Sequence, residues 1–196
     1  MKKSTLTLII IVAVVALLAI WLISSYNTMV ALNEEVTTKW SNVESQYQRR
    51  ADLIPNLVAT VKGYAAHESE TLEGVVEARA KATAITIDPS NCTPEQLAAY
   101  QNAQGELGSA LGRLMAISEN YPDLKANTNF LELQEQLEGT ENRIQVSRRE
   151  YNETVQVYNT RIRQFPANIV ASMFGFNTMV KFEADEAAKQ APKVEF

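Results

Sequence analysis

The N-terminal apolar run is the feature that most constrains this chain. It begins at Leu6 and ends at Ile23, and Thr7 is its only polar side chain. Because a helix rises 1.5 Å per residue, about 20 residues span the roughly 30 Å hydrocarbon core of a bilayer. The run therefore predicts a membrane-spanning helix, and we expect residues 1–25 to anchor the rest of the chain.

A cleavable secretory signal is the alternative interpretation, because signals also combine a basic start with an apolar stretch. The exit from the run, WLISSYNTMV, lacks an Ala-x-Ala cleavage site, which favours a retained single-pass anchor. Lys2 and Lys3 precede the run, and only Lys39 follows soon after it. The positive-inside rule then predicts a cytoplasmic N-terminus and an external body, although two lysines leave the opposite topology open.

Composition bounds the remaining chain. Its 196 residues carry a net charge of -5, so beyond the anchor there is about one domain, without the excess of Lys and Arg that nucleic-acid binding needs. We therefore expect no nucleic-acid partner. The single cysteine, Cys92, cannot form an internal disulfide.

Hydrophobic periodicity predicts an all-α chain, since apolar residues recur at helical spacing and no segment alternates as a half-buried strand does. The first stretch after the anchor has a seven-residue seam made of Trp40, Tyr47, Ile54 and Val61. We expect the anchor to continue as one helix to about Ala84, kinked at Pro55 because proline removes a backbone hydrogen bond. Residues 26–180 should form a long antiparallel helical bundle with coiled-coil character.

Two further long helices are predicted. One starts after Thr93, which reads as an N-cap with Pro94 at the first helical position and Gln96 completing a capping box. Its three glycines suggest either close approach of a neighbour or a weak helix; they are Gly105, Gly108 and Gly112.

The last long helix starts near Asn127 and carries a second seam, made of Phe130, Leu137, Ile144, Tyr151, Tyr158 and Phe165. Pro166 should end it. A short helix with a C-cap at Gly175 follows, and residues 181–196 are predicted to be a charged, loosely held tail.

Short connections imply antiparallel neighbours, so the second helix should fold back on the far end of the first, and the third should run outward again. The membrane-proximal part of the first helix would then lack an internal partner. Its apolar stripe consists of Met29, Val30, Leu32, Val36 and Trp40. Such an exposed stripe predicts self-association or a partner protein.

No catalytic or metal-binding array is evident. His67 is the only histidine and lacks a second histidine at helical spacing, and Ser24 and Ser25 have no base beside them. There is no Gly-rich phosphate loop ending in Lys. We expect a non-enzymatic protein without a cofactor or metal.

Polar residues within the seams are more distinctive. Arg50 occupies a seam position and is expected to pair with Glu141 or Glu138 on the third helix. The pairs Tyr151-Asn152 and Tyr158-Asn159 stand one heptad apart. Their amides are predicted to bond to the first helix and set its register, with solvated asparagines as the alternative.

Several ordered blocks, read together, resemble the LemA family from the anchor to the C-terminus. They are YNTMV, RRADLIPNLVATVKGYAAHE, EARA, YPDLKANTNFLELQEQLEGTENRI, REYNETVQVYN and FPANIVASMFGF. The resemblance implies a bacterial envelope protein with one membrane helix on an all-helical bundle. It does not imply a defined biochemical activity.

Carried over by position, the family's signature residues are Trp40, Arg50, Asp52, Pro55, Asn56, Glu68, Arg79, Pro122, Glu141, Asn142, Arg143, Tyr151, Asn152, Tyr158, Asn159, Phe165 and Pro166. The favoured function is a membrane-anchored scaffold of the bacterial inner membrane, which self-associates or holds envelope proteins through the stripe, RRADLIPN and TENR. The alternative is a ligand-binding or enzymatic module whose polar pocket is lined by Arg50, Glu68, Glu141 and Arg143.

Overall fold

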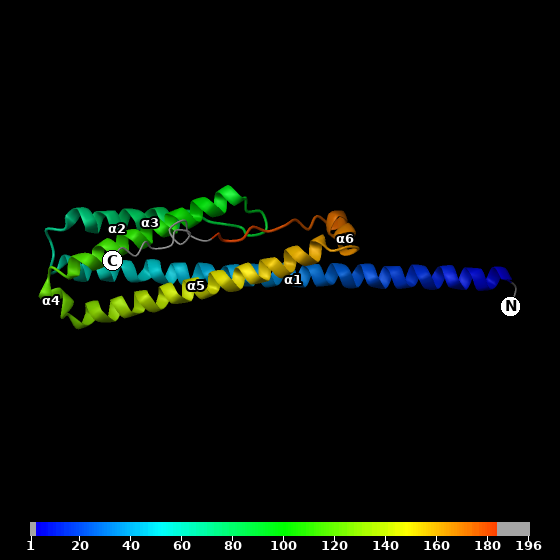
Figure 1. The fold of residues 1–196 in the computed structure, drawn as a ribbon, viewed down its shortest axis with the longest axis horizontal. Helices are drawn as coiled ribbons and strands as arrows, with labels where there is room; N and C mark the ends of the chain where they lie inside the picture. The colour runs from blue at the N-terminus through cyan, green and yellow to red at the C-terminus, as the bar shows by residue number, and fades with distance from the viewer. Residues whose placement is uncertain (1–2, 184–196) are drawn as a thin grey trace, which may run out of the picture.

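The computed structural model describes residues 3–183, which form helices and connecting segments without a strand. The elements are α1 (Lys3–Lys62), α2 (Ser69–Ala84), α3 (Pro94–Ser118), α4 (Pro122–Lys125), α5 (Thr128–Arg163) and α6 (Ala167–Phe174). Figure 1 shows α1 running the full length of the molecule, with its N-terminal part projecting alone from one end of the body. The predicted all-α fold is confirmed.

The projecting part of α1 is the predicted anchor. Within residues 3–183, α1 is the one helix that is both long enough and apolar enough to cross a membrane. Its apolar window is not covered by the other described residues. The 60 residues of α1 correspond to a rod of about 90 Å. One unbroken helix therefore carries the apolar run directly into the body.

The predicted helix caps are present. The Thr93 hydroxyl accepts from the Gln96 backbone N–H at 3.2 Å, and the Gln96 side chain accepts from the Thr93 N–H at 2.9 Å. Asn127 caps α5 by accepting from the Phe130 N–H at 3.0 Å. Gly175 ends α6 with φ +75, a conformation that favours glycine.

The expectation of one helix reaching Ala84 is wrong, because α1 ends at Lys62. The Gly63 N–H donates to the carbonyls of Ala59 and Thr60 at 3.3 and 3.2 Å, and the turn that follows reverses the chain into α2. This extra reversal also corrects the predicted directions. As Figure 1 shows, α2 returns, α3 runs outward, and α5 runs back toward the N-terminal end of the body.

Because α5 returns, it covers the membrane-proximal part of α1. Met29 and Val36 are fully buried, and Trp40 is 2% exposed. These residues share a core with the C-terminal half of α5, including Tyr151 and Tyr158. The expected exposed stripe is therefore absent, and with it the physical reason first given for self-association.

An extended segment after α6, residues 176–183, lies along α5 and is held by the two predicted asparagines. The Asn159 amide donates to the Met179 carbonyl at 2.8 Å and accepts from the Met179 N–H at 2.9 Å. Asn152 pairs in the same way with Phe182, at 2.9 and 2.8 Å. The amides thus bond to this segment and not to α1, which corrects the predicted partner.

The spacing of the two asparagines explains this match. Seven residues on a helix span about 10.5 Å, and three residues of extended chain, from Met179 to Phe182, span about 10 Å. The Tyr151 hydroxyl, whose pKa is raised by burial, donates to the Val180 carbonyl at 3.0 Å between the two amide pairs. Asn152 and Asn159 therefore form a row of hydrogen-bonded pairs, the asparagine ladder, that holds the extended segment against α5.

Phe182 closes the core at the end of that ladder. Its ring stacks on Trp40 at 5.6 Å between centroids, and the Arg148 guanidinium lies 4.8 Å from its centroid. Residues 181–183, the start of the predicted loose tail, thus include a buried side chain. The remainder of that tail, residues 184–196, lies outside the described residues.

Pro55 does not interrupt α1, although it lacks the N–H that would bond to the Ala51 carbonyl one turn earlier. Arg79 on α2 supplies the missing donor: its Nε donates to the Ala51 carbonyl at 2.8 Å. Ala51 is 1% exposed, so water cannot readily replace this bond. The cross-helix bond satisfies the acceptor that the proline leaves open and joins α2 to α1.

We predict that Arg79→Met lowers the free energy of unfolding by about 1–3 kcal/mol, because it leaves a buried carbonyl without a donor. Adding Pro55→Ala should restore part of this loss, since Ala at position 55 can donate to the Ala51 carbonyl within the helix. Urea unfolding of the detergent-solubilised full chain, followed by circular dichroism, measures both. A double variant no more stable than Arg79→Met alone would contradict this account.

Candidate functional site

Arg50 lies at the boundary between two hydrophobic clusters of the body. Tyr47, one turn before it, belongs to the cluster around Trp40, and Ile54, one turn after it, belongs to the distal cluster around Leu107 and Phe130. Arg50 itself is only 4% exposed. A buried charge at such a position is costly unless it is paired and hydrogen-bonded.

The Arg50 guanidinium meets three acceptors on two other helices. One terminal nitrogen donates to Glu141 Oε2 on α5 at 2.9 Å, which confirms the pairing expected from the sequence. The other donates to the backbone carbonyl and side-chain oxygen of Gln104 on α3, at 3.0 and 2.8 Å. The Gln104 amide in turn donates to the Ala82 carbonyl on α2 at 3.2 Å. Arg50 and Gln104 together thus link α1, α2, α3 and α5.

Gln104 was not identified from the sequence. A usable signal exists, because Gln104 stands at helical spacing between the buried residues Tyr100, Leu107 and Leu111 of α3. A polar residue on an otherwise apolar face indicates a partner within the core.

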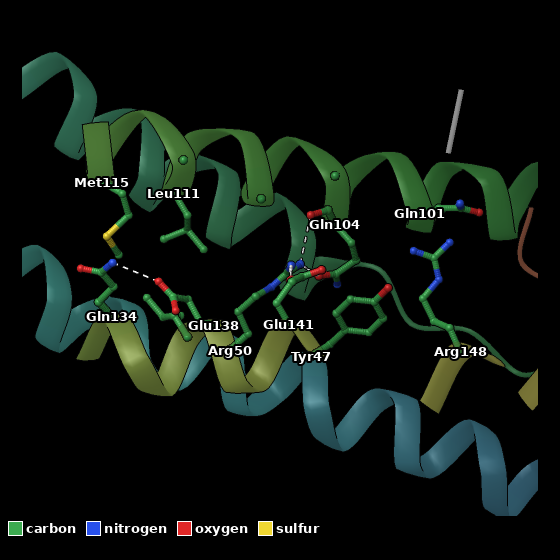
Figure 2. Close-up of a pocket in the computed structure, with 14 residues that line it drawn as sticks. Tyr47, Arg50, Gln101, Gln104, Leu111, Met115, Gln134, Glu138, Glu141 and Arg148 are labelled. Carbon is green, nitrogen blue, oxygen red and sulfur yellow. Dashed lines mark hydrogen bonds and ion pairs between the residues drawn. The ribbon is translucent and has the colours of Figure 1, made fainter. Parts of the chain in front are cut away.

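Beside Arg50, a groove of about 380 Å³ separates α3 from α5. Figure 2 shows Arg50 and Glu141 near its middle, Leu111 and Met115 toward one end, and Arg148 with Gln101 at the other. Its α3 wall contains the three glycines noted above. A Cβ on Gly105 or Gly112 would meet nothing within 4 Å, so these glycines do not accommodate a closely packed helix. Because these glycines have no side chains, they leave the groove between α3 and α5 open.

The other candidate residues lie apart from this groove. Asp52 is exposed on α1 and accepts from Gln48 at 2.7 Å, and Pro55 and Asn56 are exposed one turn further along. Arg143 donates to Gln46 and to Thr140, at 3.3 and 3.1 Å.

Glu68 accepts from the Tyr121 hydroxyl at 3.1 Å, near the outer end of the bundle. Of the four residues expected to share one polar pocket, Arg50 and Glu141 line the groove, and Glu68 and Arg143 do not.

The arrangement is suited to holding helices together. Arg50 donates to groups of the protein itself, and Glu141, about half exposed, faces it from the rim. Within residues 3–183, His, Cys, Asp and Glu side chains form no group of three or more that could hold a metal ion. The chemistry that the site offers is therefore charge and hydrogen bonding along an open groove.

We predict that Arg50→Met lowers the free energy of unfolding by about 1–3 kcal/mol, because the Gln104 acceptors lose a buried donor. Glu141→Gln should cost less, about 1 kcal/mol or below, because the half-exposed position remains hydrated and Arg50 keeps Gln104. Urea unfolding of the two variants and the parent chain in one detergent provides the comparison. Equal losses, or no loss for Arg50→Met, would contradict the assignment of Arg50 as the central clamp.

Comparison with known proteins identifies relatives of this chain. The model of the LemA family matches residues 39–196. Magnetosome protein MamQ 1 of Paramagnetospirillum magneticum is 32% identical over 199 residues, covering 93% of this chain and 73% of the relative. Magnetosome protein MamQ of Magnetospirillum gryphiswaldense is 30% identical over 206 residues, covering 95% and 76%.

Protein LemA of Metamycoplasma hominis is 26% identical over 160 residues, covering 82% of this chain and 69% of the relative. The family match covers most of the body and includes the Arg50 clamp and the asparagine ladder. The chain belongs to the LemA family.

Proposed function

We propose that this chain is a membrane-anchored, non-enzymatic helical interaction protein of the bacterial cell envelope, with its body outside the inner membrane. The observation that carries the proposal is the uncovered apolar window of α1, on the same unbroken helix that forms the core of the body. An 18-residue apolar stretch is stable in a bilayer and costly in water. Such a helix holds the body at a fixed distance from the membrane.

The non-enzymatic part rests on how the polar groups are used. Arg50, Gln104 and Glu141 bond to one another across helices, and Asn152 and Asn159 bond to the backbone of the extended segment. These groups stabilise one arrangement of the body. The surface left for a partner protein is the open side of the groove between α3 and α5, together with the exposed residues of RRADLIPN and TENR.

Topology is tested with a cysteine at Glu73, an exposed residue of α2, in a Cys92→Ser background. We expect an impermeant maleimide to label this position in cells whose outer membrane has been permeabilised and whose inner membrane is intact. The reason is that Lys2 and Lys3 favour a cytoplasmic N-terminus. A cysteine at Lys2 is the matched control and should be labelled only after lysis. The reverse pattern would place the body in the cytoplasm.

We also infer self-association, through contacts between membrane segments: the described body leaves the side chains of residues 6–23 accessible to a second copy as well as to lipid. Multi-angle light scattering of the full chain in detergent, at micromolar concentration, should give a mass of at least two copies. Glu141→Gln, a substitution in the body and outside the membrane segment, should keep that mass. A monomer under these conditions would contradict self-association and leave the anchor proposal intact.

A further inference from the structure

The short helix α6 has an apolar outer surface that the other residues of 3–183 do not cover. Ile169 and Met173 are 51% and 66% exposed, one turn apart on the helix, and Phe165, just before it, is 82% exposed. Its other side, with Ala167, Val170 and Ala171, is buried in the body. Clustered exposed apolar side chains of this size mark an interaction surface.

The position of α6 places this exposed surface beside the membrane end of α1. The Tyr26 ring of α1 contacts Phe174 and Phe176, at 4.8 and 5.6 Å between ring centroids. Tyr26 stands three residues after Ile23, or about 4.5 Å along the helix axis. Figure 1 shows α6 at the end of the body from which the N-terminal part of α1 projects. The exposed surface of α6 is thus at the level where α1 leaves the hydrocarbon core.

Charge at this end of the body fits a lipid surface as well. The chain contains 23 acidic residues, yet none lies in residues 1–33, which include the apolar run, or in residues 154–182, which include α6. The second stretch carries Arg161, Arg163 and Lys181. Cations without acids beside an apolar helix are the pattern of a segment lying at a membrane interface, where anionic headgroups attract the charges.

We propose that Phe165 and the outer surface of α6 insert into the headgroup region of the bilayer that holds residues 6–23, so that the body meets the membrane at two points. The inference rests on the proposed membrane anchor. The second contact fixes the tilt and rotation of the body relative to the membrane, which the single helix α1 leaves free. The groove between α3 and α5 is then presented in one orientation.

The test uses the full chain in a Cys92→Ser background, with one cysteine at Met173 labelled with an environment-sensitive NBD fluorophore. The protein is reconstituted into vesicles of phosphatidylcholine and phosphatidylglycerol in equal amounts, without nitroxide lipids or with lipids that carry a nitroxide either close to the headgroup, to probe position 173, or in the middle of the acyl chain, to probe position 17. Two comparison positions are labelled in the same way: Leu17 in the apolar run, and Val76, a 51% exposed apolar residue of α2, which Figure 1 shows apart from α6. Nitroxide lipids quench only fluorophores that contact lipid.

We expect the label at position 173 to emit at shorter wavelength than the label at position 76, and to lose emission with nitroxide lipid. The label at position 17 should also be quenched, and that at position 76 should not. Quenching at 17 without quenching at 173 would overturn the inference and leave the anchor standing. No quenching at either position would overturn both.

A second copy of the chain is the competing occupant of this surface. In that case, the emission at position 173 would shift to shorter wavelength without lipid quenching, and the shift would fade as the protein is diluted in lipid; this result would overturn the inference. Replacing Phe165 and Ile169 together by Ser should reduce quenching at 173 and leave quenching at 17 unchanged. Because both side chains are exposed, the circular dichroism spectrum of this variant should match that of the parent chain.

Discussion

The continuity of α1 is the constraint on which the rest of the structure depends. Its apolar run and the buried face of the body share one helix axis, so α2, α5 and α6 pack along that rod, and α3 packs on α2. α5 provides the main covering surface, and α6 and residues 176–183 complete it near the membrane end. Continuity holds even at Pro55, because Arg79 supplies the donor that the proline lacks.

Polar contacts select this packing from among others of similar hydrophobic burial. Apolar seams with a seven-residue repeat tolerate a shift by one heptad, since another apolar residue then takes each place. Arg50 does not tolerate such a shift, because its acceptors on Gln104 and Glu141 would be lost while the charge stays buried. The asparagine ladder sets the register of residues 176–183 in the same way. These contacts contribute specificity as much as stability.

Local sequence signals predicted the local structure well. Thr93, Asn127 and Gly175 each act through neighbours a few residues away, so their capping geometry follows from the chain itself. The Arg50–Glu141 pair also followed from the seam, since each residue occupies a helix face turned toward the other helix. Gln104 was missed, although its place between the apolar residues Tyr100 and Leu107 indicates a buried position, because that pattern does not identify the partner on another helix.

The sequence by itself determined that the chain is helical, that it carries one apolar run long enough for a membrane, and where most of its helices begin and end. These properties depend on periodicity, composition and caps, which act over a few turns of helix. The tertiary structure alone decided the reversal after Lys62, and hence that α5 covers the membrane-proximal part of α1. The turn around Gly63 reverses the chain because α2 and α5 then bury apolar side chains against α1. Such contacts join residues far apart in the sequence, so no single segment predicts them.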